Sequence, residues 1–414
     1  MRRAFLLLCP CLALAAEPGD LPPAALVEKA LRAYPPVQAA AAEVRAEEAQ
    51  RDRLEAGPYE FAIKLASQRR RERPLAQNYR EHEIGVERPF RLPGKVAKDT
   101  EIGAAGVELA QYALGDALHE SARLLLGRWF DWLRESATTN VWAAQVELLR
   151  HQQGAVEKRV AAGDASRLEL LLSGSQLAQA EAQLAQARAR RERAAAEFSQ
   201  HFPTIPLPTQ LQPPTPQAIA DSPERWRERI LEHHHELQMA RVASRRSQLA
   251  AQRAEADRLP DPTLGLHLSS ERDGQERVFG LQISIPLPGG ARSAQARAGL
   301  AEASAASSRE AHALVRAEAE ARRTVSLAQG SHAQWLRLDE VAASMEESAR
   351  LLEKAWRLGE GQFTELQTAR RQAIEARLAA TQSQIEANEA RYRLLLDAHQ
   401  LWSFLSDDDS AGNP

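Results

Sequence analysis

The chain lacks the residues that support a disulfide framework or most kinds of catalysis. Its two cysteines, Cys9 and Cys11, both lie within the first fifteen residues. The sequence contains no nucleophile elbow, phosphate-binding loop, HExxH motif or dinucleotide fingerprint. A disulfide scaffold, a zinc–cysteine cluster and a cysteine nucleophile are therefore excluded for the rest of the chain. We expect no enzymatic activity and no cofactor.

Basic excess, aromatic residues and long apolar runs are also scarce. The 53 basic and 56 acidic side chains give a formal net charge of −3, so no basic excess favours nucleic acid as a partner. Aromatic residues make up 5% of the chain, whereas Ala, Leu, Gln, Glu and Arg are abundant, which is typical of long helices and coiled coils. No apolar run reaches the roughly 20 residues that a membrane-spanning helix needs.

The N-terminus has the features of a secretory signal peptide. Arg2 and Arg3 precede an apolar run from Ala4 to Leu14, and a small-x-small cleavage site ends at Ala15. We predict that residues 1–15 are a signal peptide and that the mature protein is exported. A lipid anchor is a weaker alternative, because neither cysteine follows a small residue.

Two stretches alternate between apolar and polar residues, which is the period of a β-strand. In Pro262–Pro286, leucines at 264, 266 and 268 and apolar residues at 279, 281, 283 and 285 predict a hairpin. Asp273-Gly274, within the polar segment Ser270–Arg277, is a strong turn signal. Tyr59–Leu92 repeats the pattern around a longer polar segment, Ser67–Arg80, which we predict to be a turn.

The first hairpin differs from the second in its charges. Arg69, Arg70, Arg71 and Arg73 crowd its predicted turn, and Arg88 interrupts its apolar face. We favour a solvated turn for the four arginines over contact with anionic lipid headgroups.

The rest of the mature chain predicts long helices. We expect a helix over residues 24–55 that Pro35-Pro36 interrupts, then helices over residues 95–162 and 167–201 that meet at a Gly163-Asp164 turn. A helix of some 65 residues would span about 100 Å, and glycines 103, 106, 115 and 127 are expected to mark breaks. Two further helices are predicted over residues 293–358 and 364–405, on either side of a Gly359-Glu360-Gly361 turn.

The second half of the chain repeats the first. Leu92-Pro93-Gly94 corresponds to Leu287-Pro288-Gly289, Gly163 to Gly359, and Glu169-Leu170 to Glu365-Leu366. Each half therefore predicts a helix, a β-hairpin and a long helical hairpin. We assign residues 24–202 and 224–405 to two structural repeats, residues 203–223 to a proline-rich linker, and residues 406–414 to an acidic disordered tail.

Four strands with one apolar face are too few to close a barrel. Open sheet edges cannot face lipid, so a sheet whose apolar face lies in a membrane must close. Three copies of the chain would supply twelve strands with cyclic symmetry. The predicted fold class is therefore mainly α with a small share of a membrane β-barrel.

The sequence resembles a known family. The duplicated pattern, the PDPTLGL strand, the ISIPLPGG strand end and the two Gly-acidic turns are similar to those of the TolC family of outer-membrane efflux factors. Within the family, the hairpin segment from PDPTLGLHLSS to ISIPLP most resembles the CzcC-like, heavy-metal-efflux branch. The resemblance covers residues 24–405.

The resemblance implies a fold and a function. The fold is a homotrimer with a twelve-stranded barrel in the bacterial outer membrane and an α-helical tunnel in the periplasm. The function is passive conduction, as the exit duct of a tripartite efflux system, with a periplasmic adaptor (membrane fusion protein) and an inner-membrane pump of the RND type as partners. Heavy-metal cations are the first expected cargo. Drug efflux and type I secretion are alternatives, and a soluble periplasmic coiled-coil adaptor or scaffold is an alternative of another class.

Two sets of candidate site residues follow. Polar residues of the strands are expected to line the barrel lumen, with a solvated face of a soluble sheet as the alternative: Glu60, Lys64, Glu83, Glu87, His267 and Gln282. By the resemblance, residues of the two helical turns form the periplasmic gate and the adaptor-docking tips: Val160, Gly163, Asp164, Leu358, Gly359 and Glu360. Rings of Asp164 and Glu360 carboxylates would select cations, and helix capping is the alternative. No metal site is predicted, because His233, His234 and His235 are adjacent on a helix and point in different directions.

Overall fold

The computed structural model describes residues 20–74, 76–209 and 212–402. The predicted signal peptide with both cysteines, and the acidic tail, lie outside these residues. The helices are α1 (Ala24–Arg32), α2 (Pro35–Ala56), α3 (Pro93–Ala161), α4 (Arg167–His201), α5 (Pro223–Glu232), α6 (His235–Ala256), α7 (Gly290–Arg357) and α8 (Phe363–Asp397). The strands are β1 (Ala62–Glu72), β2 (Gln77–Pro89), β3 (Thr263–Glu271) and β4 (Glu276–Ser284). Within the described ranges, no helix combines the length and the apolarity needed to cross a membrane.

The described residues form two compact units. The first contains residues 20–34, 119–226 and 322–402, and the second contains residues 35–118 and 227–321. Each unit draws on both halves of the chain, and the long helices α3 and α7 contribute to both units. The predicted fold class, mainly helical with a small antiparallel sheet, agrees with this arrangement.

The glycines of α3 do not interrupt it, so the predicted breaks were wrong. A Cβ on Gly103 would lie 3.0 Å from the Cα of Arg51, and a Cβ on Gly115 would lie 2.8 Å from the His235 ring. The absence of a side chain lets neighbouring helices approach α3 closely. A glycine inside a helix costs about 1 kcal/mol, and at these two positions it allows the close packing.

Helix α8 ends at Asp397 and not at the predicted residue 405. His399 has φ +54°, and the amides of Gln400 and His399 donate to the carbonyls of Leu395 and Leu396 at 2.7 and 3.0 Å. These two bonds form a Schellman end with histidine at the position that glycine usually occupies. The sequence therefore lacks the glycine that would have signalled this end.

Aromatic packing anchors the first unit. Phe130, Phe198 and Trp129 are buried, and the rings of Trp129 and Phe198 meet edge to face at 5.6 Å. Trp129 and Tyr392 donate hydrogen bonds to the backbone carbonyl and the carboxylate of Asp20, each at 2.8 Å. The start of the described chain is thereby fixed to the core of the unit.

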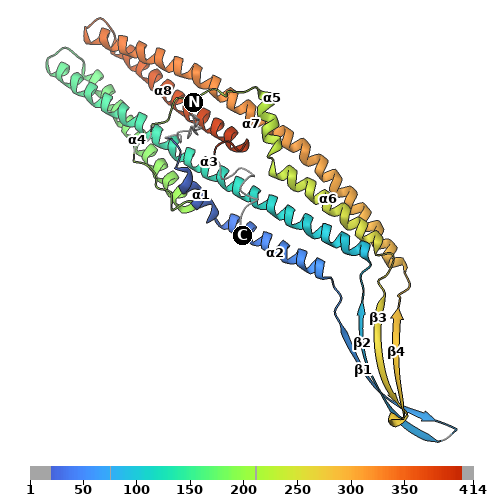
Figure 1. The fold of residues 1–414 in the computed structure, drawn as a ribbon. Helices are drawn as coiled ribbons and strands as arrows, with labels where there is room; N and C mark the ends of the chain where they lie inside the picture. The colour runs from blue at the N-terminus through green and yellow to red at the C-terminus, as the bar shows by residue number, and fades with distance from the viewer. Residues whose placement is uncertain (1–19, 75, 210–211, 403–414) are drawn as a thin grey trace, which may run out of the picture. The chain divides into compact units, whose positions relative to one another are not determined.

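The second unit contains one antiparallel sheet with strand order β1-β2-β3-β4 (Figure 1). Both predicted hairpins are present, but the turns are shorter than predicted. Residues 67–72 pair with residues 77–82, so both strands extend into the predicted turn and the crowded arginines lie mostly in β1. The predicted turn over Ser67–Arg80 was wrong because continuous strand pairing holds these polar residues in extended backbone.

Candidate functional site

The register of the four strands sorts their side chains onto two faces. Leu65 pairs with Ile84, Ile84 with Leu268, and Leu268 with Phe279, which makes a transverse row of four apolar residues. Ile63, Val86, Leu266 and Leu281 form the next row in the same way. Because side chains alternate along a strand, these rows and the residues two positions apart from them define the apolar face of the sheet. The intervening residues define its polar face.

The apolar face is exposed in a single chain. Leu65 is 76% exposed and Phe279 is 69% exposed, and the other members of the two rows are also more than one third exposed. Contiguous apolar surface of this kind marks an interaction with lipid, protein or ligand. Arg88, which interrupts the face in sequence, lies at its edge with its guanidinium 4.8 Å above the Phe61 ring.

The polar face carries most of the residues predicted to line a lumen. Lys64, Glu83, Glu87, His267 and Gln282 all lie on it, as the register requires. Glu60 precedes β1 and lies outside the paired strands. The Lys64 ammonium pairs with the Glu87 carboxylate at 2.5 Å, and Arg70 pairs with Glu81 at 3.5 Å. The face is therefore mixed in charge and partly neutralised.

The His267 ring lies over one of its two glycine neighbours in the sheet. His267 lies directly between Gly85 and Gly280 in the register. A Cβ on Gly280 would lie 2.1 Å from Cε1 of the imidazole, so the ring occupies the space above this glycine. Gly85 on β2 and Gly280 on β4 therefore flank the same histidine.

The ends of the two helical hairpins form the second candidate site, within the first unit. At the α3 end, the amides of Gly163 and Asp164 donate to the carbonyls of Val160 and Arg159 at 3.1 and 2.8 Å. At the α7 end, Gly359 and Glu360 donate to Trp356 and Ala355 at 3.0 and 2.9 Å. Gly163 has φ +83° and Gly359 has φ +79°. Both ends are Schellman motifs that need a left-handed residue, so the predicted equivalence of the two turns holds in detail.

The two hairpin ends contact each other. Val156 from α3, Trp356 from α7, and Phe363 and Leu366 from α8 form one buried cluster, against which Val160 packs. Arg159 lies 4.7 Å above the Trp356 ring. Of the predicted tip residues, Leu358 is 65% exposed, and Gly163, Asp164, Gly359 and Glu360 are exposed as well. These exposed groups lie beside a buried apolar cluster.

A buried ionic cluster that sequence reasoning missed lies at the base of the sheet. Lys95 is 1% exposed. Its ammonium contacts the carboxylates of Asp261 at 2.9 Å and Asp257 at 3.1 Å and donates to the carbonyl of Leu259 at 2.7 Å. Buried charge is tolerated when it is paired and hydrogen-bonded in this way.

Asp261 also ties the strand ends to this cluster. Its carboxylate accepts hydrogen bonds from the Tyr59 hydroxyl at 2.6 Å, just before β1, and from the Leu92 amide at 3.2 Å, just after β2. Burial raises the pKa of Asp261, but hydrogen bonds from Tyr59 and Lys95 lower it by a larger amount. The pKa of this carboxyl group therefore lies below its ordinary value. We call Lys95, Asp257 and Asp261, with the linked ion pairs of Arg253 and Asp99, the junction network.

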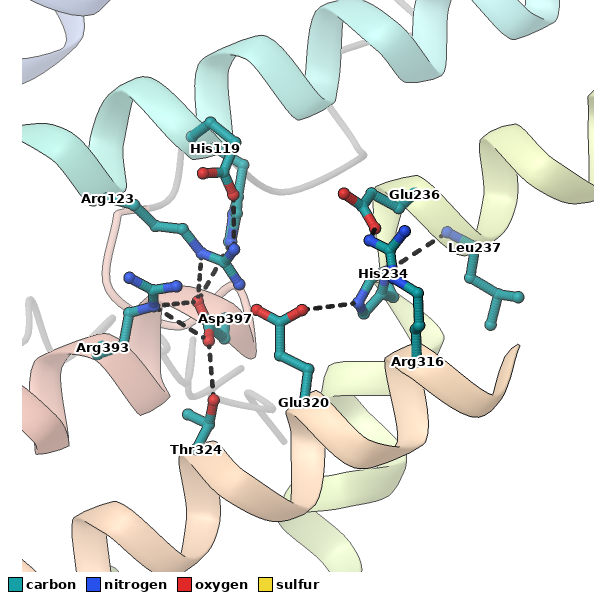
Figure 2. Close-up of polar contacts among 11 residues, drawn as sticks. His119, Arg123, His234, Glu236, Leu237, Arg316, Glu320, Thr324, Arg393 and Asp397 are labelled. Carbon is teal, nitrogen blue, oxygen red and sulfur yellow. Dashed lines mark hydrogen bonds and ion pairs between the residues drawn. The ribbon is translucent and has the colours of Figure 1, made fainter. Parts of the chain in front are cut away.

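A second buried carboxylate lies within the first unit, on α8 (Figure 2). The Asp397 side chain is 1% exposed and accepts from Arg123 at 2.9 Å, Arg393 at 3.1 Å and Thr324 at 3.3 Å, with the His119 ring at 3.3 Å. Burial raises the pKa of Asp397, but the hydrogen bond from His119 and the two arginines outweigh it and hold the pKa well below its ordinary value.

The adjacent histidines 233–235 do not share one direction. His234 is the N-cap of α6, and its ring accepts from the Leu237 amide at 3.4 Å (Figure 2). Its Nε2 atom lies 3.7 Å from Glu320. His235 is buried against Gly115. These two side chains serve capping and packing in the second unit.

Solved structures share this fold. The chain is similar to the outer-membrane channel OprN (19% identity, 90% of this chain and 89% of that chain, TM-score 0.76). It is also similar to the open state of the Neisseria gonorrhoeae MtrE outer-membrane channel (17% identity, 92% and 89%, TM-score 0.74) and to the Vibrio cholerae outer-membrane protein VceC (15% identity, 90% and 95%, TM-score 0.73). No protein-family profile and no curated protein matches the sequence. At these identities the likeness establishes the fold.

Proposed function

We propose that this protein is the outer-membrane exit duct of a tripartite exporter, as the TolC-like features of its sequence imply. The observation that carries the proposal is the four-stranded sheet, whose apolar face is exposed in a single chain and whose opposite face is polar. This division is expected of a barrel wall with lipid on one side and water on the other. The likeness of the fold to three solved outer-membrane proteins supports it.

The sheet has two edges that a barrel must close. In the order β1-β2-β3-β4, β1 and β4 are the outer strands, and each neighbour is antiparallel. The outer strands therefore run in opposite directions, so β4 of one copy can pair antiparallel with β1 of the next. Three copies give twelve strands and leave no edge. The proposed assembly is a homotrimer in the bacterial outer membrane with its helices in the periplasm.

In this assembly the polar face lines the lumen. Lys64, Glu83, Glu87, His267 and Gln282 contribute to the wall, and Glu60 lies at its periplasmic end. Three copies of each side chain tune passage through charge and hydrogen bonding. The channel binds no cofactor in this mechanism, and transport is conduction driven by the pump.

The hairpin ends are the proposed gate and adaptor-docking tips. Val160, Gly163 and Leu358 provide an apolar and conformationally fixed surface, and Asp164, Gly359 and Glu360 project beyond it. Repeated around the threefold axis, the two carboxylates form acidic rings that favour cations. A periplasmic adaptor and an inner-membrane pump, of the RND type, are the proposed partners.

Heavy-metal cations are the first proposed cargo, on the resemblance of residues 260–288 to the CzcC-like branch. A deletion strain would be tested against zinc, cobalt, cadmium, copper and common antibiotics. Metal sensitivity, restored by the wild-type chain, is the expected result. Sensitivity to antibiotics alone would contradict the metal assignment and leave the exit-duct proposal in place, with drug efflux as its cargo.

A cysteine cross-linking experiment tests the trimeric barrel. The chain from residue 12 onward contains no cysteine, so introduced pairs report directly. Lys64→Cys in β1 is combined with Val278→Cys, Gln282→Cys or Ser284→Cys in β4, and membranes are oxidised before electrophoresis. We expect one register to give covalent trimers from the outer-membrane fraction.

The matched control places both cysteines inside one chain. Glu83 and Ser269 are directly paired between β2 and β3, so Glu83→Cys/Ser269→Cys should form a disulfide without any oligomer. Recovery of the wild-type protein in the soluble periplasmic fraction, with no covalent trimer in any register, would refute the duct and favour a periplasmic scaffold.

A further inference from the structure

The apolar face of the sheet changes character at one row. Phe279, Leu281 and Ile283 lie on this face of β4, and Phe279 belongs to the last wholly apolar row. The next row toward the hairpin turns is Ser67, His82, Ser270 and Arg277. Arg69 pairs with Arg80 in the row after that, and Arg71 pairs with Asn78 beyond it. Four arginines thus continue the apolar face of the sheet.

Acidic residues are excluded from this face. All six glutamates of the strands lie on the polar face: Glu72, Glu81, Glu83, Glu87, Glu271 and Glu276. Arg70, which lies on the polar face, has Glu81 and Glu271 as ion-pair partners. Arg69, Arg71, Arg80 and Arg277 are exposed and form no ion pair with any residue in the described ranges. A merely solvated hairpin end would not need such separation of charge.

The pairing of Arg69 with Arg80 is a cost to the isolated sheet. Like charges that are directly opposite on neighbouring strands destabilise the pairing. Asp273 accepts a hydrogen bond from the Arg80 backbone amide at 2.8 Å and not from its guanidinium group. An external anion that contacts both guanidinium groups would relieve the repulsion.

We propose that Arg69, Arg71, Arg80 and Arg277, here named the basic rim, bind the phosphate groups of lipid headgroups in the leaflet that the hairpin turns reach. The proposal rests on the proposed function, because the apolar face must first lie against lipid. Guanidinium groups bind phosphate oxygens with two parallel hydrogen bonds. The basic rim would fix the depth of the barrel in the membrane.

The geometry favours a lipid over free phosphate. Apolar residues alternate from Phe279 in β4 to Ile285, just beyond the end of the strand, over six residue steps or about 20 Å. Arg277 adjoins Phe279 on the same face. A ligand with acyl chains beside a phosphate matches both parts of this surface, whereas inorganic phosphate matches only the second.

The test compares two double variants of the purified full chain in a neutral detergent. Arg69→Gln/Arg80→Gln removes the opposed pair. Arg188→Gln/Arg193→Gln on α4 makes the same change of charge at two exposed positions far along the chain from the sheet. Three probes are used: lipid A with two phosphates, lipid A without phosphates, and inorganic phosphate.

Wild type and the α4 control should retain bisphosphorylated lipid A about tenfold better than Arg69→Gln/Arg80→Gln. The preference should weaken in high salt and vanish for the dephosphorylated lipid. Without lipid, Arg69→Gln/Arg80→Gln should unfold no earlier than wild type, because an unfavourable pair has been removed. That result would separate binding from a structural role.

Equal retention of bisphosphorylated lipid A by all three proteins would overturn the proposal. Binding of inorganic phosphate as tight as binding of the lipid would also overturn it. These outcomes leave the exit duct intact if wild type still fractionates with the outer membrane. Failure of wild type to reach the outer membrane would instead remove the premise, and both proposals with it.

Discussion

Replacing Lys95 with methionine tests whether the junction network holds the sheet to its helices. Methionine keeps the length of the side chain and removes the charge, so the variant loses the contacts of the ammonium with Asp261, Asp257 and the Leu259 carbonyl. Removing one partner of a buried ion pair costs about 3–5 kcal/mol, because the other charge stays behind without compensation.

The structure places Lys95→Met at the lower end of that range. The side chain of Asp257 is 40% exposed, so water can solvate it, and Asp261 keeps the Tyr59 hydroxyl and the Leu92 amide. We therefore expect the free energy of unfolding to fall by about 3 kcal/mol at pH 7. The assay is urea unfolding of the purified full chain in detergent, followed by far-ultraviolet circular dichroism.

The loss of stability in Lys95→Met should depend on pH. The folded-state pKa of Asp261 lies below its ordinary value, so in wild type this carboxylate contributes stability above that ordinary value and loses it as pH falls through the folded-state pKa. Without Lys95 the carboxylate can take up a proton at a higher pH. The difference between wild type and Lys95→Met should therefore be largest near neutral pH and shrink toward pH 4.

Two further variants make the reasoning refutable. Lys98→Met makes the same change three residues along α3, where the partly exposed side chain pairs with Glu101, and should alter stability by less than about 0.5 kcal/mol. Lys95→Met/Asp261→Asn removes both charges and should recover about 2 kcal/mol of the loss. If Lys95→Met matched Lys98→Met, or if the double variant showed no recovery, the junction network would not be a coupled structural element.

Three other predictions follow from close contacts in the structure. Gly280→Val should displace the His267 ring, because a Cβ there would lie 2.1 Å from Cε1, and should cost about 1 kcal/mol of stability. Adding His267→Ala should restore the urea midpoint, and an unrestored midpoint would contradict the packing of the ring over Gly280. Gly359→Ala should cost about 1 kcal/mol through its φ of +79°, with Gly359→Asn milder; hydrogen exchange over residues 352–366 measures the loosening, and equal protection in all three proteins would argue against the left-handed cap. Asp397→Asn should cost about 3 kcal/mol at neutral pH. Because the pKa of Asp397 is depressed, its stabilisation is present above the ordinary carboxyl pKa and is lost only below about pH 4; a constant difference down to pH 3 would refute that assignment.

The strands were predictable where alternation is strict. Leu264 to Leu268 and Phe279 to Ile283 each place every second residue on one face, and the structure keeps that parity across all four strands. The prediction failed at residues 67–72, because arginine and serine on the apolar side interrupt the hydrophobic pattern although the backbone stays extended. Alternation reveals a strand only where one face is apolar. It gives no signal where that face carries charged residues.

The helical repeat was predictable for a different reason. Gly163 and Gly359 recur at equivalent places because both turns need a left-handed residue, and that need is visible in sequence. The contacts of Lys95 with Asp257 and Asp261 were not predictable, because they join segments distant in the chain and no periodicity links them. Gly103, Gly106 and Gly115 of α3 were misread for the same reason, since the residues close to them lie on other helices.

The pairing of β2 with β3 determines the order in which the sheet can form. β1 and β2 are neighbours in sequence and can form a hairpin as soon as both have emerged, but His82 must wait for Ser270 before β2 gains its second partner. Contacts between such distant residues form slowly, because the loop between them must close first. During that interval the first hairpin presents the edge of β2 together with Ile84 and Val86. A chain whose second half is missing is therefore expected to expose this edge permanently, and truncation after α4 should yield aggregates in place of a half-sheet.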